Sequence, residues 1–174
     1  MSTVQDGDGN EFIKGLEAKR GCPVGWRTYS TFYADSNGVV RQYGVFLYEA
    51  GGRFWFEDFE HEPQILGFKL PKSKNAAPYV KFESGFDPND VLKTRTVKKN
   101  AAKSLAGGFK PRSKVKAAGI LARCFSQCVT EVSLKDGTVL FFELADKTLQ
   151  NMIDNWHQYG KTTKHKKETH IDKE

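Results

Sequence analysis

The chain has 174 residues, of which 39% are apolar and 13% aromatic, so it is long enough to form one domain with a hydrophobic core. Its three cysteines, the lack of an apolar run near residue 1 and the lack of an Asn-x-Ser/Thr site argue against a secreted, disulfide-built protein. No stretch approaches the ~20 apolar residues that span a bilayer. We therefore expect a cytoplasmic protein without a transmembrane segment.

The net charge of +6 is unevenly distributed. Residues 91–130 contain no acidic residue but ten basic ones, which are Lys93, Arg95, Lys98, Lys99, Lys103, Lys110, Arg112, Lys114, Lys116 and Arg123. A basic segment of this kind indicates a polyanion, an anionic membrane surface or an acidic partner. Acidic residues crowd into 57–62, and we interpret them as a solvated strand edge protected by charge: Glu57, Asp58, Glu60 and Glu62.

Residues 1–22 are predicted to be a flexible N-terminal segment with one short helix. The polar stretch up to about Asn10 favours disorder. A helix over Glu11–Arg20 would present Phe12, Ile13 and Leu16 to the domain, and Cys22-Pro23 would end it.

From Gly25 onward the sequence favours strands. Turns at 35–38 and at Gly51-Gly52 separate runs rich in aromatic and β-branched residues. We expect five strands in this part of the chain, at about 26–33, 39–49, 54–60, 65–70 and 79–83.

Residues 87–121 form the basic insertion that we expect between the fifth and sixth strands. Residues 87–106 fit either a strand followed by a helix or a single helix, because Thr94 and Thr96 favour extended backbone while Asp87-Pro88 is a plausible helix start. A two-turn helix is predicted from Asn100 to the glycines at 107–108. The stretch 110–116 has too few apolar residues to predict a fixed position.

A hairpin and a helix complete the domain. The turn at Lys135-Asp136-Gly137-Thr138 joins two apolar segments and predicts a hairpin over 122–144. Beyond Asp146 the period changes to 3.6, with one apolar stripe made of Leu149, Met152, Ile153 and Trp156. Asp146 and Gly160 are placed to cap this helix, and its stripe should lie on the preceding sheet. Residues 161–174 are predicted to be a disordered, lysine-rich tail.

This order of elements resembles the pleckstrin-homology-like (PH-like) superfamily. The residues that carry the resemblance are Thr138–Leu144 as a last strand and the Trp156 stripe as the terminal helix. The resemblance implies a mainly β fold for residues 23–160: a seven-stranded antiparallel bent sandwich or barrel capped by the C-terminal amphipathic helix. By itself it licenses no function.

The first hairpin departs from the pattern of many phosphoinositide-binding members of that superfamily. Those members resemble each other in a basic cluster there, whereas the turn at 35–38 carries Asp35 and is flanked only by Arg27 and Arg41. Lysine and arginine chemistry lies instead in the insertion.

Catalytic, metal and cofactor sites are poorly supported. The sequence lacks phosphate-loop, dinucleotide and HExxH motifs, so we expect no catalytic residues and no cofactor. Cys128 with His157 could form a nucleophile pair, although a buried structural thiol is the better interpretation. Cys124 and Cys128 in one strand would lie about 13 Å apart and could not share a metal ion. His165 and His170 fall in the tail and are interpreted as solvated.

The sequence thus predicts a non-catalytic binding or scaffolding module that works through protein contacts or an anionic membrane surface. Its expected contacts are the basic residues of the insertion: Lys98, Lys99, Lys103, Lys110, Arg112, Lys114 and Lys116. The alternative is a nucleic-acid-associated protein that binds phosphate through the same segment. That alternative has few aromatic side chains for base stacking, since the insertion holds only Phe109. Oligomeric state is left open, as is a purely solvated loop.

Overall fold

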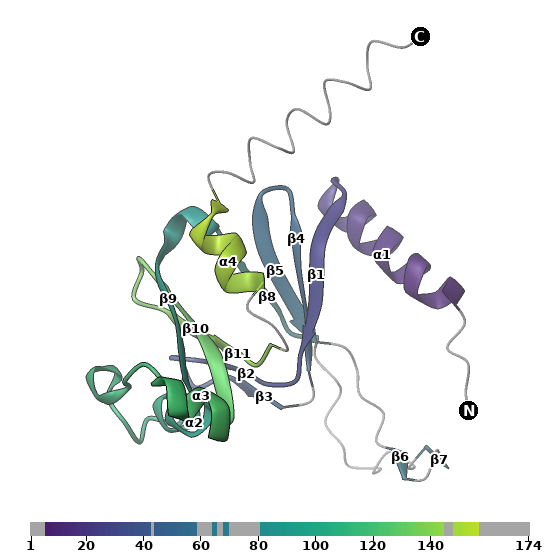
Figure 1. The fold of residues 1–174 in the computed structure, drawn as a ribbon. Helices are drawn as coiled ribbons and strands as arrows, with labels where there is room; N and C mark the ends of the chain where they lie inside the picture. Colours follow the sequence, from purple (N-terminus) through teal and green to yellow (C-terminus); the bar gives the residue numbers. More distant parts are fainter. Residues whose placement is uncertain are drawn as a thin grey trace.

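The computed structural model is mainly β, with two antiparallel sheets of four and five strands and several helices (Figure 1). It describes residues 6–42, 44–58, 64–65, 68–69, 81–144 and 148–156. No helix in these ranges is long and apolar enough to cross a membrane. Within them the two sheets are separate and are not closed into a barrel.

The first sheet has the strand order β1-β4-β5-β8. Its strands are β1 (Val24–Ser30), β4 (Val45–Ala50), β5 (Arg53–Asp58) and β8 (Glu83–Phe86). The predicted turn between β4 and β5 is confirmed, and it uses Gly51 and Gly52 at φ values of 62° and 81°, which side chains with a Cβ rarely adopt. Nearly every residue of β4 is buried, because both faces of this sheet are covered.

The second sheet has the strand order β3-β2-β11-β10-β9. Its strands are β2 (Tyr33–Asp35), β3 (Val40–Arg41), β9 (Val91–Lys98), β10 (Cys128–Leu134) and β11 (Val139–Phe142). The predicted hairpin is confirmed for β10 and β11, with Gly137 at φ 90° in the turn. Its predicted first residues are not strand, because Ile120–Phe125 forms helix α3.

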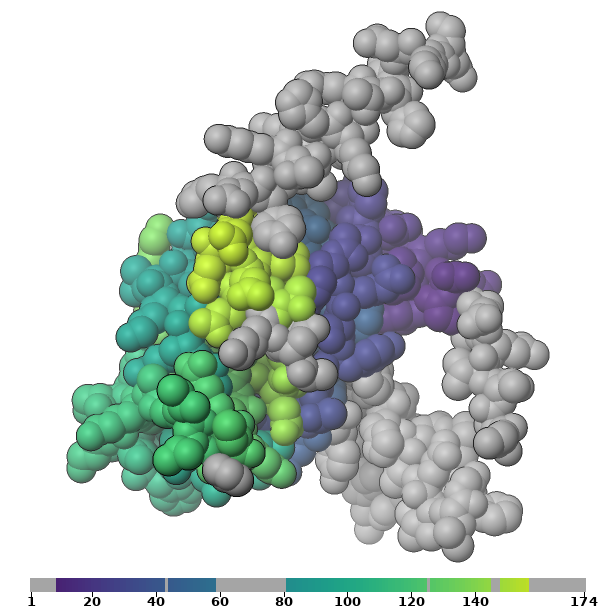
Figure 2. All heavy atoms as spheres, in the orientation of Figure 1, coloured from purple at the N-terminus to yellow at the C-terminus, as the bar shows by residue number. Residues whose placement is uncertain are grey.

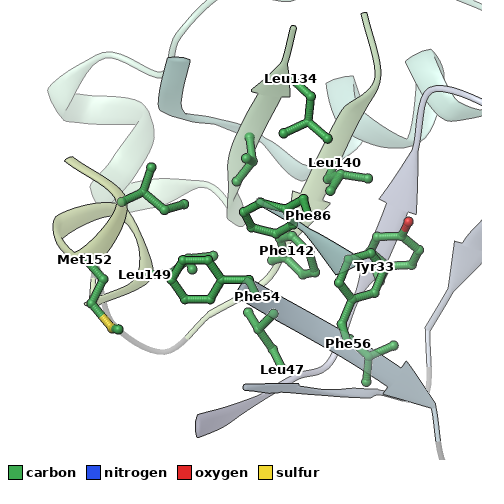
Figure 3. Close-up of a cluster of buried hydrophobic side chains, with 13 residues drawn as sticks. Tyr33, Leu47, Phe54, Phe56, Phe86, Leu134, Leu140, Phe142, Leu149 and Met152 are labelled. Atoms are coloured by element: carbon green, nitrogen blue, oxygen red, sulfur yellow. The ribbon is translucent and has the colours of Figure 1, made fainter. Parts of the chain in front are cut away.

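Aromatic side chains fill the space between the sheets (Figure 3). Phe56 and Phe142 are fully buried and meet edge to face, with ring centroids 5.3 Å apart. Helix α4 (Thr148–Asp154) adds Leu149 to this core, and the Trp156 ring lies 5.5 Å from that of Phe54. The predicted packing of the terminal helix on the sheet is therefore confirmed, while Asp146 and Gly160 lie outside the described residues.

Helices also cover the outer face of each sheet. Helix α1 (Asp6–Arg20) buries Leu16 against Phe46 and Tyr48 of the first sheet. The predicted docking of 11–20 is confirmed, but residues 6–10 are helical rather than flexible, and residues 1–5 lie outside the described part. Helix α2 (Lys99–Ala106) covers the second sheet in the same way.

Several predicted strands have different bounds. The run 26–33 divides into β1 and β2, which belong to different sheets, and 39–49 divides into β3 and β4. The predicted strand at 65–70 is instead a small pair, β6 (Gln64–Ile65) with β7 (Phe68–Lys69), that joins neither sheet. The predicted strand at 79–83 begins only at Glu83, as β8, and its first two residues lie outside the described ranges.

The predicted insertion is shorter than expected. After the turn η1 (Pro88–Asp90), strand β9 pairs with β10 over its whole length, from Val91 opposite Leu134 to Lys98 opposite Cys128. The segment 87–106 is therefore a strand followed by a helix. The basic insertion proper is the connection between β9 and β10, residues 99–127.

Candidate anion-binding face

The connection between β9 and β10 is held firmly on the second sheet. Helix α2 buries Ala102 and Ala106 against Phe32, Val97 and Phe141. Small alanine side chains let the helix backbone approach the sheet closely. The predicted two-turn helix is thus confirmed, and its apolar side sets the orientation of its lysines.

The following loop, which includes η2 (Arg112–Lys114), is fixed as well. Val115 is 3% exposed and joins the cluster beneath α2. The Ala118 N–H donates to the Thr96 carbonyl at 2.8 Å, and Ala117 forms a β-bridge with Val97. The expectation that 110–116 has no fixed position was wrong, because one well-placed valine and two backbone contacts anchor the loop to β9.

Four lysines converge on one hollow beside this loop. The hollow has a volume of about 330 Å³. Its lining is made of Lys98, Ala101, Lys110, Lys114, Lys116, Ala117, Ala118 and Gly119. We call the part formed by Lys98, Lys110, Lys114 and Lys116 the lysine hollow.

The lysine hollow is strongly positive. It contains no acidic residue, and within the described ranges none of its four lysines is paired with a carboxylate. Helix α2 starts after Lys98 without a capping side chain, and its first turn reaches the hollow at Ala101. The partial positive charge of the helix start adds to that of the lysines. The arrangement suits an anionic group that approaches from solvent.

The other predicted contacts lie elsewhere. Lys99 and Lys103 are one helical turn apart and lie over the Phe32 ring, with Nζ 5.3 and 5.8 Å from its centroid. Lys99 Nζ also contacts Glu143 Oε2 at 2.7 Å. Desolvation raises the pKa of Glu143, but hydrogen bonds from Lys99 and Thr31 outweigh it and leave that pKa below its ordinary value. Lys99 therefore has an internal structural role, and exposed Arg112 lies outside the lysine hollow.

Glu57 and Asp58 do not form a solvated edge. Glu57 lies on β5, which is an interior strand of its sheet, and its side chain is 1% exposed. It meets Lys19 at 3.3 Å and Lys81 at 3.1 Å. Asp58 accepts a hydrogen bond from the Phe82 N–H at 2.8 Å. The prediction failed for Glu57 because α1 folds over its side of the sheet, and for Asp58 because Arg41 and the Phe82 N–H contact it. Glu60 and Glu62 lie outside the described ranges.

The two nearby cysteines occupy different elements. Cys124 is exposed in α3, whereas partly buried Cys128 begins β10 and points its Sγ toward the Ala122 carbonyl at 3.6 Å. Their predicted placement in one strand was wrong. The described residues contain no cluster of three or more His, Cys, Asp or Glu side chains suited to a metal ion, and His157, His165 and His170 lie outside those residues.

A second, smaller hollow of about 220 Å³ lies between β9 and α4. Val91, Thr94, Ile153 and Trp156 are among its lining residues. Thr94 Oγ1 donates to Asp154 at 2.9 Å across it, so part of its polar surface is already satisfied internally. It carries less charge than the lysine hollow.

Sequence reasoning missed three exposed apolar side chains near the lysine hollow. Phe109 is 88% exposed, Ile120 82% and Leu121 74%. The available signal was the position of Phe109 and Ile120 directly after glycines, with Phe109 also followed by a charged stretch. We call these three residues the apolar rim.

Comparisons of this chain with protein-family models, with curated proteins and with solved structures gave no match.

Proposed function

We propose that the protein is a non-catalytic binding module that docks on an anionic membrane surface in the cell through the lysine hollow. The observation that carries this proposal is the convergence of Lys98, Lys110, Lys114 and Lys116 on one hollow without any acidic residue. Elsewhere in the described structure, cations such as Lys99 and Arg95 have carboxylate partners. Lysines that have no carboxylate partner in the described part of the chain and share one site are suited to an external anion.

The expected affinity is modest. Each basic side chain near an anionic leaflet contributes ~1 kcal/mol, so four lysines give about 4 kcal/mol, which corresponds to a dissociation constant of about 1 mM. Charge alone would therefore give reversible, salt-sensitive recruitment.

A membrane fits the site better than a nucleic acid does. Base stacking needs several aromatic platforms, and the connection between β9 and β10 offers one exposed aromatic side chain of known placement, Phe109. The lysines alone would still neutralise phosphates without sequence preference, so nucleic-acid binding remains the competing outcome of the experiment below.

We also propose that the domain is PH-like. Two features support this proposal. The chain continues from β1 into β2, so the order of strands runs β8-β5-β4-β1 in one sheet and on from β2 through β11 and β10 to β9 in the other. Just after helix α4, Trp156 then packs against Phe54 at the border of the core. Asp35 is occupied in its own turn, where its carboxylate accepts from the Asn37 and Val39 N–H groups, and this fits an anion site located away from the first hairpin.

The experiment is cosedimentation of the full chain with phosphatidylcholine vesicles, with and without phosphatidylserine, from about 0.05 M to about 0.5 M salt. We expect binding only to the phosphatidylserine vesicles, with a steady loss as salt increases. Equal partitioning to both vesicle types at low salt would contradict the proposal. Retention on a DNA column without vesicle binding would favour the nucleic-acid alternative.

A further inference from the structure

The apolar rim is adjacent to the lysine hollow along the chain. Phe109 directly precedes Lys110, and Ile120 directly follows Gly119, and both of these neighbours line the hollow. Consecutive Cα atoms are 3.8 Å apart, so two of the three rim residues are within one residue of the hollow's lining. Few large apolar side chains elsewhere in the described residues are comparably exposed, the next being Leu92 at 64%.

Backbone hydrogen bonds hold both parts of the rim. The Phe109 N–H donates to the Ser104 carbonyl at 2.8 Å, just after Gly108 at φ 73°. Around Ile120 and Leu121, the Arg123 N–H donates to the Gly119 carbonyl at 3.1 Å. The Arg123 side chain also donates from Nε to the Ala118 carbonyl at 3.2 Å. The apolar side chains are therefore presented to solvent by a supported backbone.

Exposed large apolar side chains next to lysines without carboxylate partners among the described residues suit the surface of an anionic bilayer. At the surface of an anionic bilayer, phosphate groups lie directly above the acyl chains, so cations and apolar side chains are satisfied a few ångströms apart. The hollow's volume of about 330 Å³ is the volume that about ten water molecules occupy in the liquid. That is enough for a phosphate group with some of its hydration. Duplex nucleic acid would leave Ile120 and Leu121 without apolar contact.

We propose that the apolar rim inserts into the boundary between headgroups and acyl chains of an anionic bilayer, while the phosphate of a lipid headgroup occupies the lysine hollow. This inference rests on the proposed membrane function and deepens it, because it adds an apolar contribution that salt does not screen. Partial burial of these three side chains at the interface adds an apolar contribution to that of the lysines. Binding should therefore weaken with salt but persist at a residual level.

The test compares two triplets of measurements on the full chain. The first is vesicle affinity for the wild type, for F109S/I120S/L121S and for L92S, which removes a similarly exposed apolar side chain on β9. The second places a tryptophan reporter by L121W or L92W and measures quenching by lipids brominated on their acyl chains, after subtraction of the signal from wild-type tryptophans. All the changed side chains are exposed, so we expect each variant to fold, and thermal unfolding checks this.

We expect the triple variant to lose on the order of tenfold or more in affinity for phosphatidylserine vesicles, and L92S to bind like the wild type. The L121W signal should be quenched and the L92W signal should not. Unchanged affinity of the triple variant, or no quenching of L121W, would overturn the insertion while leaving the proposed function intact. Failure of the wild type to bind phosphatidylserine vesicles would overturn both.

Discussion

Helix α1 and the connection between β9 and β10 lie on opposite sides of the molecule (Figures 1 and 2), and the cations of the two regions differ in what faces them. Lys19 and Arg20 end helix α1 against the first sheet, whereas the lysine hollow lies on the connection between β9 and β10, on the second sheet. The first group is surrounded by carboxylates and aromatic rings. Among the described residues no carboxylate lines the second group, which is open to solvent.

The α1 group is closely paired. Lys19 contacts Glu57 and also donates to Glu83. Arg20 donates to Glu83 at 2.5 Å and to the Tyr48 hydroxyl at 3.0 Å, and its guanidinium lies 3.7 Å from the centre of the Trp55 ring. These contacts tie α1 to the outer face of the first sheet.

The comparison shows that the surroundings of a lysine or arginine, rather than its charge, decide its role. Cations with buried carboxylate partners stabilise the fold, because leaving the partner unpaired is costly. Cations that converge on solvent without partners are available to an external anion.

The largest expected effect comes from breaking the pair between Arg95 and Glu131. Glu131 is 1% exposed, and Arg95 Nε and Nη2 each donate to it at 2.9 Å. The substitution R95M would leave a buried carboxylate without its cation and should cost about 3–5 kcal/mol in the free energy of unfolding. Urea denaturation measures this. The control K93M, at an exposed position on the same strand, should change stability by no more than about 0.5 kcal/mol; equal effects of the two would refute the distinction.

The contact of Arg20 with the first sheet should matter somewhat less. R20M removes hydrogen bonds to Glu83 and Tyr48 and should cost about 1.5–3 kcal/mol. Hydrogen exchange should accelerate in α1 before it does in the strands, because the helix is released from the sheet locally. K14M, at an exposed position of the same helix, is the control. Uniform acceleration over the whole chain would argue against a local role.

Acid should weaken the same attachment. Desolvation raises the pKa of Glu83, but hydrogen bonds from Lys19 and Arg20 prevail and lower it from 4.5 to about 2. Because the folded-state pKa is below the unfolded one, the stabilisation is complete above pH 4.5 and is lost as pH falls from 4.5 toward 2. The difference in stability between wild type and E83Q should shrink across this window. A constant difference would show that the pairing does not depend on the charge of Glu83.

The smallest expected effect concerns a surface pair. Lys135 Nζ lies 3.9 Å from Asp90, and both side chains are more than half exposed. K135M should change the free energy of unfolding by less than about 0.5 kcal/mol, since solvent and salt screen such pairs. A cost above about 1.5 kcal/mol in thermal denaturation would mean that burial does not separate structural cations from the others.

Local signals in the sequence predicted the elements that depend on neighbouring residues. Asp136-Gly137 located the hairpin, and the 3.6-residue stripe ending at Trp156 located the helix that packs against Phe54. The corrections concern pairing over long distances. Strand β9 resembled an insertion because it carries Lys93 and Arg95, and only Glu131, 36 residues further on, gives Arg95 its partner.

The candidate site was likewise predicted in part, because its residues are visible in the sequence but their grouping depends on the fold. A run of charge is visible in any sequence, so the lysines of 98–116 were found. Their separation into two groups depends on where α2 lies: Lys99 and Lys103 are four residues apart and therefore share one side of the helix, over Phe32. The burial of Glu57 depends on α1. Its contact there, Lys19, lies 38 residues before Glu57 in the sequence.

Docking through the lysine hollow is tested most directly by the affinity for phosphatidylserine vesicles of two variants with equal loss of charge. One is K98Q/K110Q/K114Q/K116Q, which neutralises the lysine hollow. The other is K14Q/R27Q/K93Q/K135Q, which neutralises four exposed cations elsewhere. We expect the first to lose about a thousandfold in affinity at an unchanged melting temperature, at ~1 kcal/mol for each lysine, and the second to lose far less. Equal losses from both variants, or unaltered binding by the first, would show that the lysine hollow is not the membrane-docking site.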